Sequence, residues 1–286
     1  MIGEVSVVIP VYNESSTLSR VISSIQNVLE GIDIKKEIIV VEDGSDDDTL
    51  ESISNIRDIV VIRHDMNRGY GAALLTGIRY SSFKYILIVD ADGTYPAEDI
   101  PVFFMKIETA DMLVGVRQGQ QALGSFVRRC GRDVIRRLAN YLVGCQIPDL
   151  NSGMRLMKKD VVLKFQNLLP QNFSFTTTIT LAMLCNHYHV KYIPINYAMR
   201  VSGKSKIKPF RDILNFIQLI VRTVMYFNPL KIFIPISLLL LVALGISVIS
   251  DVMLSNLTDK TVILFSASSI VLSVGCLADL IDKRIL

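Results

Sequence analysis

Apolar runs rich in β-branched residues alternate with amphipathic stretches over the first part of the chain. Residues 5–10 form the first run, and an amphipathic stretch at residues 17–29 follows after a polar turn. This order predicts a strand, a loop and a helix. Three more pairs repeat it, with strands predicted at 37–41, 59–63 and 85–90 and helices at 47–56, 71–81 and 97–108. Four successive strand–helix units predict an α/β domain with a largely parallel sheet.

Two long stretches near the end of the chain carry no charge. Residues 232–250 form a stretch of 19 residues, and residues 261–278 form one of 18. About 20 apolar residues cross a hydrocarbon core, so each stretch predicts a transmembrane helix. The polar link at residues 251–260 predicts a hairpin with both ends on one side of the membrane. Two buried helices of a soluble bundle are the alternative interpretation.

The charges beside these stretches predict an orientation. Lys231 precedes the first stretch, Lys283 and Arg284 follow the second, and the link holds two acids and one lysine. The positive-inside rule therefore predicts a multi-pass membrane protein whose large N-terminal part lies on the cytoplasmic side.

A further apolar pattern, at helical spacing, occupies residues 209–229. It predicts an amphipathic juxtamembrane helix at the bilayer surface, and a core helix of the globular part is the alternative. The predicted organisation is a cytosolic domain at 1–208, this helix at 209–229 and two transmembrane helices within 230–286.

Composition narrows the class of protein. Half of the 286 residues are hydrophobic, and the formal net charge is only +3. The mean hydropathy of +0.42 excludes a disordered chain and fits a soluble part joined to a membrane part. So small a net charge gives no support to nucleic-acid binding, and we predict no nucleic-acid partner.

Polar turns follow three of the predicted strands, at residues 10–14, 42–49 and 90–94. The carboxyl ends of parallel strands share one edge of a sheet, where ligands bind in such folds. Asp90 and Asp92 stand one residue apart after a very apolar run, so their oxygens predict a site for Mg²⁺ or Mn²⁺. Capping of the next helix is the alternative for the acids at 46–49.

Six motifs in register give the sequence a resemblance to a known family. They lie at residues 8–14, 41–45, 67–71, 90–92 and 149–155, and at Arg200 with residues 203–206. The sequence resembles the family 2 glycosyltransferases of the GT-A fold. Within them it looks most like the polyprenyl-phosphate sugar synthases, which include dolichol-phosphate mannose and glucose synthases and their undecaprenyl-phosphate counterparts.

This resemblance implies an enzyme that moves a sugar, with inversion, from a UDP- or GDP-sugar to a membrane polyprenyl phosphate. It implies nucleotide contacts from five residues along the edge of the sheet, namely Pro10, Tyr12, Glu14, Asp43 and Asp90. Asp92, with Asp90, is expected to hold Mg²⁺ or Mn²⁺ on the donor diphosphate. Thr94 departs from the mannose synthases, which usually carry Gln as a further metal ligand at this place. The departure weakens the case for a mannose donor and leaves the third metal ligand open.

Two basic clusters are suited to phosphate groups. By resemblance, Arg117 and Arg129 are expected to contact the acceptor phosphate and to share the catalytic role with Asp90 and Asp92. Arg128 and Arg132 belong to the same cluster and are expected to contact the acceptor or the sugar. Arg200 and Lys206 are expected to close over the donor diphosphate. A solvated basic face attracted to anionic lipid is the alternative.

The polar turn at residues 149–155 is expected to border the sugar and the acceptor. The resemblance implies contacts from Asp149, Asn151, Ser152 and Arg155, and a bare structural turn is the alternative. The three histidines, including His64, lack metal-binding spacing and predict ordinary surface or core positions.

Other function classes are less well supported. The loop at residues 67–73 lacks the third glycine of a dinucleotide fingerprint. A processive polysaccharide synthase would need a Q-x-x-R-W motif, and this chain contains no tryptophan. The remaining alternatives are a catalytically silent membrane scaffold with the same fold and a transferase acting on another lipid or glycan acceptor.

Overall fold

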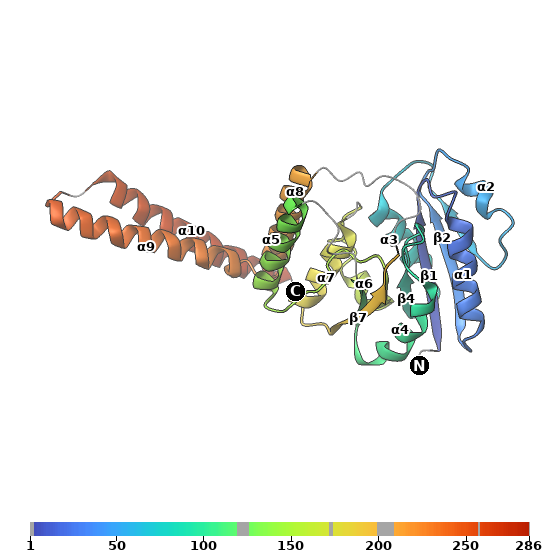
Figure 1. Cartoon of the computed structure of the whole chain (residues 1–286). Helices are drawn as coiled ribbons and strands as arrows, with labels where there is room; N and C mark the ends of the chain where they lie inside the picture. Colours follow the sequence, from blue (N-terminus) through green and yellow to red (C-terminus); the bar gives the residue numbers. More distant parts are fainter. Residues whose placement is uncertain (1–2, 119–125, 172–173, 199–208, 257, 286) are drawn as a thin grey trace.

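The computed structural model describes residues 3–118, 126–171, 174–198, 209–256 and 258–285 (Figure 1). For residues 126–132, 209–215 and 282–285 it describes the backbone only. The strands are β1 (Glu4–Val11), β2 (Lys35–Glu42), β3 (Val60–Arg63), β4 (Tyr85–Ile88), β5 (Met112–Gln118), β6 (Arg155–Lys158) and β7 (Val190–Asn196). The helices are α1 (Leu18–Glu30), α2 (Thr49–Ile53), α3 (Tyr70–Tyr80), α4 (Ile100–Lys106), α5 (Phe126–Val143), α6 (Lys159–Lys164), α7 (Phe175–Cys185), α8 (Pro209–Phe227), α9 (Leu230–Leu254) and α10 (Asp259–Ile285).

The described strands form one mixed sheet in the order β3-β2-β1-β4-β6-β5-β7. β1 pairs in parallel with β2 and β4, β2 with β3, and β5 with β7, whereas β6 runs antiparallel to β4 and β5. The predicted largely parallel α/β sheet is confirmed. The reversal of β6 matters for the site, because it brings the start of β6 to the edge where β4 and β5 end.

Alternation along the strands fills a core on each face of the sheet. In β1, Val7 and Ile9 join the core that α1 and α4 cover, whereas Val8 joins the core beneath α3, α6 and α7. A period of two is what a strand buried on both faces requires. Two predicted helices differ in detail: α2 is shorter than expected, and α4 is flanked by 3₁₀ turns at Ala97–Asp99 and Ile107–Thr109.

Helix α8 packs on the α/β domain. Its Ile220 and Val224 are fully buried with Ala139 of α5 and Leu181 of α7. Of the two interpretations of this segment, core packing is what the structure shows for the part of α8 whose side chains are described. Tyr226, half exposed, lies on the outer side of the same helix.

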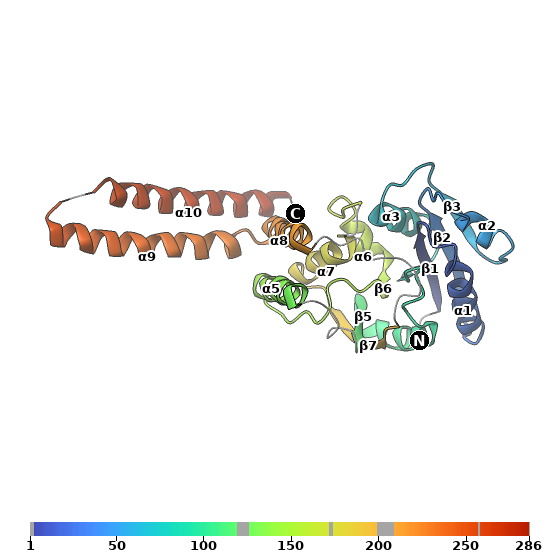
Figure 2. The same cartoon turned by 45° about the horizontal axis from the view of Figure 1, so that its top comes forward.

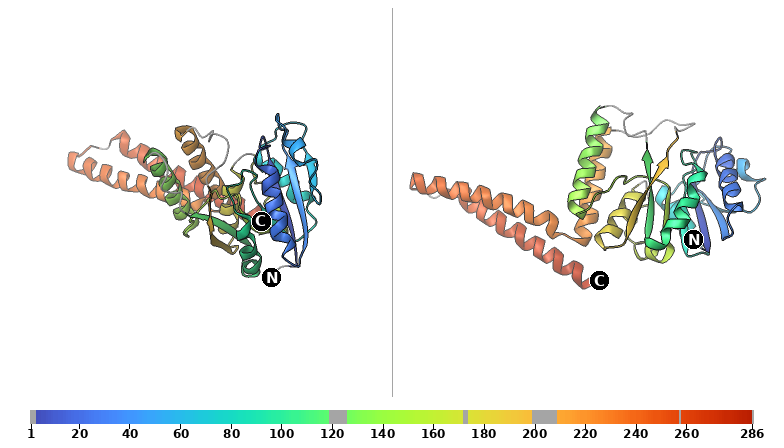
Figure 3. Two further views of the ribbon diagram at one scale, coloured as in Figure 1. Left: turned by 45° about the vertical axis from the view of Figure 1, so that its right-hand side comes forward. Right: turned by 60° about the horizontal axis from the view of Figure 1, so that its bottom comes forward.

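Helices α9 and α10 form an antiparallel hairpin that projects from the side of the domain carrying α5 and α8 (Figures 2 and 3). Both are long and apolar enough to cross a membrane, and only 11% and 17% of their most apolar windows are buried. In this structure the two helices are therefore not buried in a bundle with the domain, as the alternative interpretation would require. The hairpin is held at its turn by Asp251, which accepts hydrogen bonds from Thr258 and Thr261.

Candidate functional site

The turns that follow β1, β2 and β4 meet at one edge of the sheet, beside the turn that leads into β6. The strand register fixes this meeting: Val11 pairs with Glu42, Val8 with Ile88, and Ile88 with Arg155. The polar turns predicted after the strands therefore lie together, as the parallel order requires.

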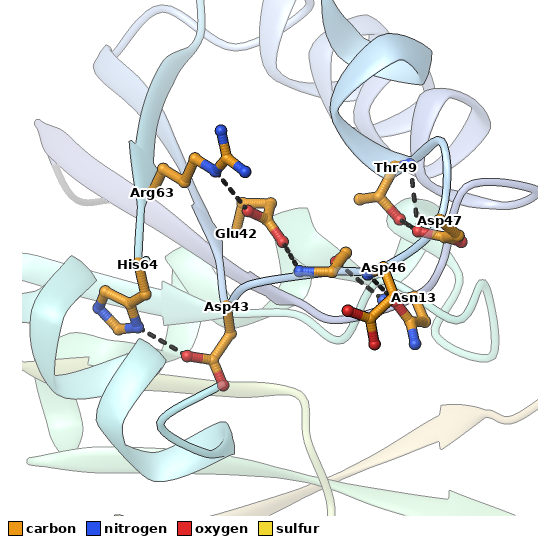
Figure 4. Close-up of polar contacts among 9 residues, drawn as sticks. Asn13, Glu42, Asp43, Asp46, Asp47, Thr49, Arg63 and His64 are labelled. Carbon is orange, nitrogen blue, oxygen red and sulfur yellow. Dashed lines mark hydrogen bonds and ion pairs between the residues drawn. The ribbon is translucent and has the colours of Figure 1, made fainter. Parts of the chain in front are cut away.

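The turns after β1 and β2 are laced together by hydrogen bonds (Figure 4). Ser45 Oγ accepts a bond from the Asn13 N–H at 3.0 Å, and Asn13 Oδ1 accepts one from the Asp46 N–H at 2.9 Å. Asn13 adopts a left-handed backbone, with φ of 56°, which asparagine tolerates better than most residues. The expected nucleotide contacts stand around this lacing: Pro10 is buried in β1, and Tyr12 and Glu14 are partly exposed.

Asp43 lies at the end of β2 with a nearly buried carboxylate that protein donors already occupy. Oδ1 lies 2.6 Å from His64 Nδ1 and accepts the Arg68 N–H at 3.0 Å, and Oδ2 accepts the Gly69 N–H at 2.8 Å. His64 Nε2 lies 3.0 Å from the Thr76 hydroxyl. Asp43 thus joins β2, the end of β3 and the turn before α3. The histidine is buried, which is one of the two positions that the sequence left open, but no sequence signal indicated its pairing with Asp43.

Glu42, the residue before Asp43, is a buried acid that sequence reasoning left without a role. Its Oε1 accepts the Ser45 N–H, and its Oε2 lies 3.5 Å from Nε of the exposed Arg63 (Figure 4). Oε2 has no hydrogen-bond partner within the part of the chain that the structure describes. Glu42 therefore stabilises the turn after β2 and keeps one oxygen available for a further donor.

Asp90 is held between α3 and the turn before β6. The Tyr70 hydroxyl donates to Asp90 Oδ1 at 2.8 Å. On its other side Gly153 approaches so closely that a Cβ atom there would lie 1.9 Å from Oδ2. Burial and the neighbouring Asp92 carboxylate raise the pKa of Asp90 to about 6, against the lowering effects of the Tyr70 bond, Arg117 and Arg155. A cation bound nearby would stabilise the ionised form of this buried carboxylate.

Asp92 is oriented by Thr94. Asp92 Oδ1 accepts both the Thr94 N–H, at 3.1 Å, and the Thr94 hydroxyl, at 2.6 Å. Thr94 itself is fully buried. The residue that stands in place of the family's usual glutamine is therefore engaged with Asp92 and does not face outward as a further ligand.

The residues of this edge fit a divalent cation. Asp90 and Asp92 offer the oxygen ligands that Mg²⁺ and Mn²⁺ prefer, and their mutual repulsion would be relieved by the ion. Among the described residues no group of three His, Cys, Asp or Glu side chains forms a complete protein cage. The remaining ligands would come from substrate phosphates and water, the usual arrangement for magnesium.

Arg117, at the end of β5, forms a two-pronged ion pair with Asp149. Its Nε lies 2.7 Å from Asp149 Oδ2 and its Nη2 lies 2.9 Å from Oδ1. The guanidinium also stands over the Tyr197 ring, 5.3 Å from the centroid. The Arg117 side chain remains 30% exposed, so it can still meet an anion. The structure thus brings two predicted site residues together, in a pairing that the sequence did not predict.

The turn at residues 149–155 corrects one expectation. Arg155 is fully buried, and its guanidinium donates to the Ser152 and Leu150 carbonyls and to the Thr180 hydroxyl. A contact between Arg155 and a sugar or acceptor is therefore wrong for this structure, because the side chain lies beneath the turn and shapes it from below. Ser152 is also buried, whereas Asn151 is exposed and accepts a bond from Thr177.

Several expected cations lie outside the part of the chain that the structure describes. Arg200 and Lys206 lie outside the described residues, and the side chains of Arg128, Arg129 and Arg132 are likewise outside the description. The last described residue before Arg200 can be placed near the acids: the Ala198 N–H donates to the Thr94 carbonyl at 3.0 Å.

Comparison with protein families gives two matches along the chain. Residues 6–165 match the model described as glycosyl transferase family 2, and residues 228–283 match one described as the GtrB C-terminal hairpin. The first match spans more than half of the chain and includes Asp43, Asp90, Asp92, Arg117 and Asp149. The second covers α9 and α10.

Curated relatives agree with the first match. A dolichol-phosphate mannosyltransferase of Pyrococcus furiosus is 29% identical over 72% of this chain and 59% of its own length. An undecaprenyl-phosphate 4-deoxy-4-formamido-L-arabinose transferase of Salmonella choleraesuis is 30% identical over 72% of this chain and 63% of its own length. The chain therefore spans less than two thirds of the length of these two relatives.

A solved structure supports the fold. Glucosyl-3-phosphoglycerate synthase of Mycobacterium tuberculosis, in complex with Mn²⁺, UDP-glucose and phosphoglyceric acid, superposes with a TM-score of 0.61. The superposition covers 77% of this chain and 79% of that one, at 18% identity. At this identity the likeness shows a shared GT-A architecture.

Proposed function

Because the chain belongs to glycosyl transferase family 2, we propose that it transfers a sugar, with inversion, from a UDP- or GDP-sugar to a membrane polyprenyl phosphate. The observation that carries this proposal is that two acids, Asp90 and Asp92, lie at the same edge of the sheet as the Arg117–Asp149 ion pair. Acids suited to a cation and an arginine that still meets solvent can serve a donor diphosphate and an acceptor phosphate together.

The chemistry of the acceptor explains why this edge needs no strong base. A phosphate monoester has a second pKa of about 6, so the attacking oxygen is already ionised at neutral pH. What remains is to stabilise the leaving diphosphate and to bring two anions together. A bound Mg²⁺ or Mn²⁺ would supply charge stabilisation to the leaving diphosphate.

The chain's own residues would divide these tasks. Asp92, oriented by Thr94, and Asp90, oriented by Tyr70, would hold the cation. Arg117 would meet the acceptor phosphate, with its fork kept in place by Asp149. The laced turns after β1 and β2, which carry Tyr12 and Glu14, would border the base and ribose. Asp43 would act on the nucleotide mainly by fixing the turn before α3, since its oxygens already accept protein donors.

A membrane acceptor suits the architecture. The proposed organisation keeps the transferase domain at 1–208, the α8 segment at 209–229 and the hairpin at 230–286. The apolar hairpin would anchor the domain at the bilayer, and the lysine and arginine residues at its ends support a cytoplasmic orientation. A domain docked on the hairpin through α8 would meet a lipid phosphate without extracting the lipid from the membrane.

The test uses the full chain in native membranes. Asp92→Asn should lower transfer of labelled sugar into the lipid phase by at least about a hundredfold, since a metal ligand is lost. Asp160→Asn, which removes an exposed acid at the start of α6, should transfer at the normal rate. Normal transfer by Asp92→Asn would contradict the metal-dependent assignment. A protein without turnover for any donor, with metal or with EDTA, would instead be a scaffold of the same fold.

A further inference from the structure

Tyr70 stands at the first position of α3, directly after the turn at residues 67–69, and its hydroxyl reaches across to the turn that follows β4. The hydroxyl donates to Asp90 Oδ1 at 2.8 Å, although the two residues are separated by 20 positions in the sequence. Tyr70 is partly buried, so its ring packs against the domain while its hydroxyl donates to the Asp90 carboxylate. The hydroxyl of Tyr70 therefore makes a specific contact with a site acid in addition to the packing of its ring.

The turn that presents Tyr70 is fixed from below by Asp43. The two oxygens of Asp43 accept the N–H groups of Arg68 and Gly69, at 3.0 and 2.8 Å. Gly69 has φ of 98°, a backbone conformation that favours glycine. Gly44 packs so closely that a Cβ atom there would lie 2.5 Å from the Met66 carbonyl carbon, so the turn has no room to shift toward β2.

Asp90 is fixed from the opposite side as well. Gly153 abuts Oδ2 of Asp90, and the Gly153 N–H donates to the Tyr95 hydroxyl at 2.7 Å. The carboxylate is therefore oriented by a hydroxyl on one oxygen and a backbone wall beside the other. Its direction is set by the protein before any ligand binds, as a cation site with few protein ligands requires.

We propose that Tyr70 is a positioning residue for the divalent cation: its hydroxyl, presented by the turn anchored on Asp43, orients Asp90 for binding the metal. The inference rests on the proposed function, because it takes Asp90 and Asp92 as the metal-binding pair. It extends that function by giving α3 and the Asp43 carboxylate a mechanical role in metal binding.

The experiment measures Mn²⁺ binding by the full chain in detergent, first without nucleotide and then with UDP or GDP, from the electron paramagnetic resonance signal of free Mn²⁺. The variants are compared in the condition in which the unaltered protein binds Mn²⁺. Tyr70→Phe should weaken Mn²⁺ binding by about tenfold, the typical effect of losing a group that orients a metal ligand. Thermal unfolding of the metal-free variant reports the structural cost separately, and the unfolding midpoint should move little because the ring stays in place.

Tyr192→Phe is the matched control. The Tyr192 hydroxyl is buried and has no hydrogen-bond partner within the described part of the chain. Its removal tests whether the loss of any tyrosine hydroxyl in the sheet region weakens Mn²⁺ binding. We expect the Mn²⁺ affinity of Tyr192→Phe to equal that of the unaltered protein.

The outcomes distinguish the positioning role of Tyr70 from the metal-dependent transferase function on which it rests. Weaker Mn²⁺ binding by Tyr70→Phe, with normal binding by Tyr192→Phe, supports the positioning role. Equal Mn²⁺ affinity in the unaltered protein and in Tyr70→Phe overturns it while leaving the transferase proposal intact. Absence of Mn²⁺ binding by the unaltered protein, both without nucleotide and with UDP or GDP added, overturns the metal-dependent function and this inference with it.

Discussion

Gly153 packs directly against the carboxylate of Asp90, and a Cβ atom on Gly153 would lie 1.9 Å from Asp90 Oδ2. The contact exists because β6 runs antiparallel to β4, so the turn before β6 arrives beside the end of β4. Any side chain at position 153 would push Asp90 away from Asp92 or from Tyr70. Position 153 therefore has to be glycine for Asp90 to keep this orientation.

Gly153→Ala should lower sugar transfer by about a hundredfold, because a shift of about 1 Å in a catalytic group has that effect. Overpacking should also lower the free energy of unfolding by about 1–3 kcal/mol. Gly31→Ala is the control, since a Cβ atom there meets only the Val28 carbonyl at 3.7 Å. Transfer assays and thermal unfolding of both variants check the prediction. Unchanged transfer by Gly153→Ala would show that Asp90 tolerates displacement.

The raised pKa of Asp90 predicts a stability cost at neutral pH. The pKa rises from 3.8 to about 6 on folding, chiefly through burial and then through Asp92. Between these values the folded state holds a proton that the unfolded state has lost. Stability from this group is thus complete below pH 3.8 and is lost as the pH rises to about 6.

Asp90→Asn should remove that cost in the metal-free protein. At pH 7 with EDTA the free energy of unfolding should rise by about 1–2 kcal/mol, a figure reduced for the partial exposure of Asp90. Sugar transfer should be lost at the same time. The measurement is the unfolding midpoint of both proteins across this pH range, and the difference should vanish near pH 4. A variant less stable than the unaltered protein at pH 7 would contradict the assigned burial and repulsion.

Arg117→Lys should separate charge from geometry. Lysine keeps the positive charge but loses the planar fork that grips Asp149 with two bonds. We expect the KM for the polyprenyl phosphate to rise by about tenfold, with the KM for the donor nearly unchanged. Arg79→Lys, on the exposed side of α3, should leave both values as they are. A rise in the KM for the donor alone would mean that Arg117 contacts the nucleotide sugar and not the acceptor phosphate.

A double-mutant cycle tests the path from Asp43 to Asp90. Asp43→Asn should weaken Mn²⁺ binding about fivefold without nucleotide, because an amide cannot accept all the donors that converge on Asp43. In the Tyr70→Phe background the same change should weaken Mn²⁺ binding less than about twofold, since the hydrogen bond from residue 70 to Asp90 is already absent. Fully additive losses would mean that Asp43 acts on the metal by another route.

Much of the fold was readable from the sequence because it rests on local pattern. The alternation in β1 and the apolar run before Asp90 identify strands whichever neighbours they find. The uncharged stretches predicted the hairpin in the same way. The acids after the strands could be placed at one edge, because parallel strands end together.

The side-chain partners could not be predicted, because they depend on register and strand direction. Tyr70 meets Asp90, and Arg117 meets Asp149, across 20 and 32 sequence positions. The burial of Arg155 follows from its place at the start of β6, where it pairs with Ile88 inside the sheet. A motif such as residues 149–155 shows that the residues belong to one turn, but only the packing shows which side chain faces the site.

The central claim is transfer of a sugar to a polyprenyl phosphate, and one assay tests it directly. Membranes containing the full chain are incubated with a short polyprenyl phosphate and a panel of labelled UDP- and GDP-sugars, with Mn²⁺ or with EDTA. The account predicts that label from one donor enters the lipid phase with Mn²⁺ and not with EDTA, and that Asp92→Asn abolishes the signal. Lipid-linked label that persists with EDTA, or no label from any donor with Mn²⁺, would contradict it.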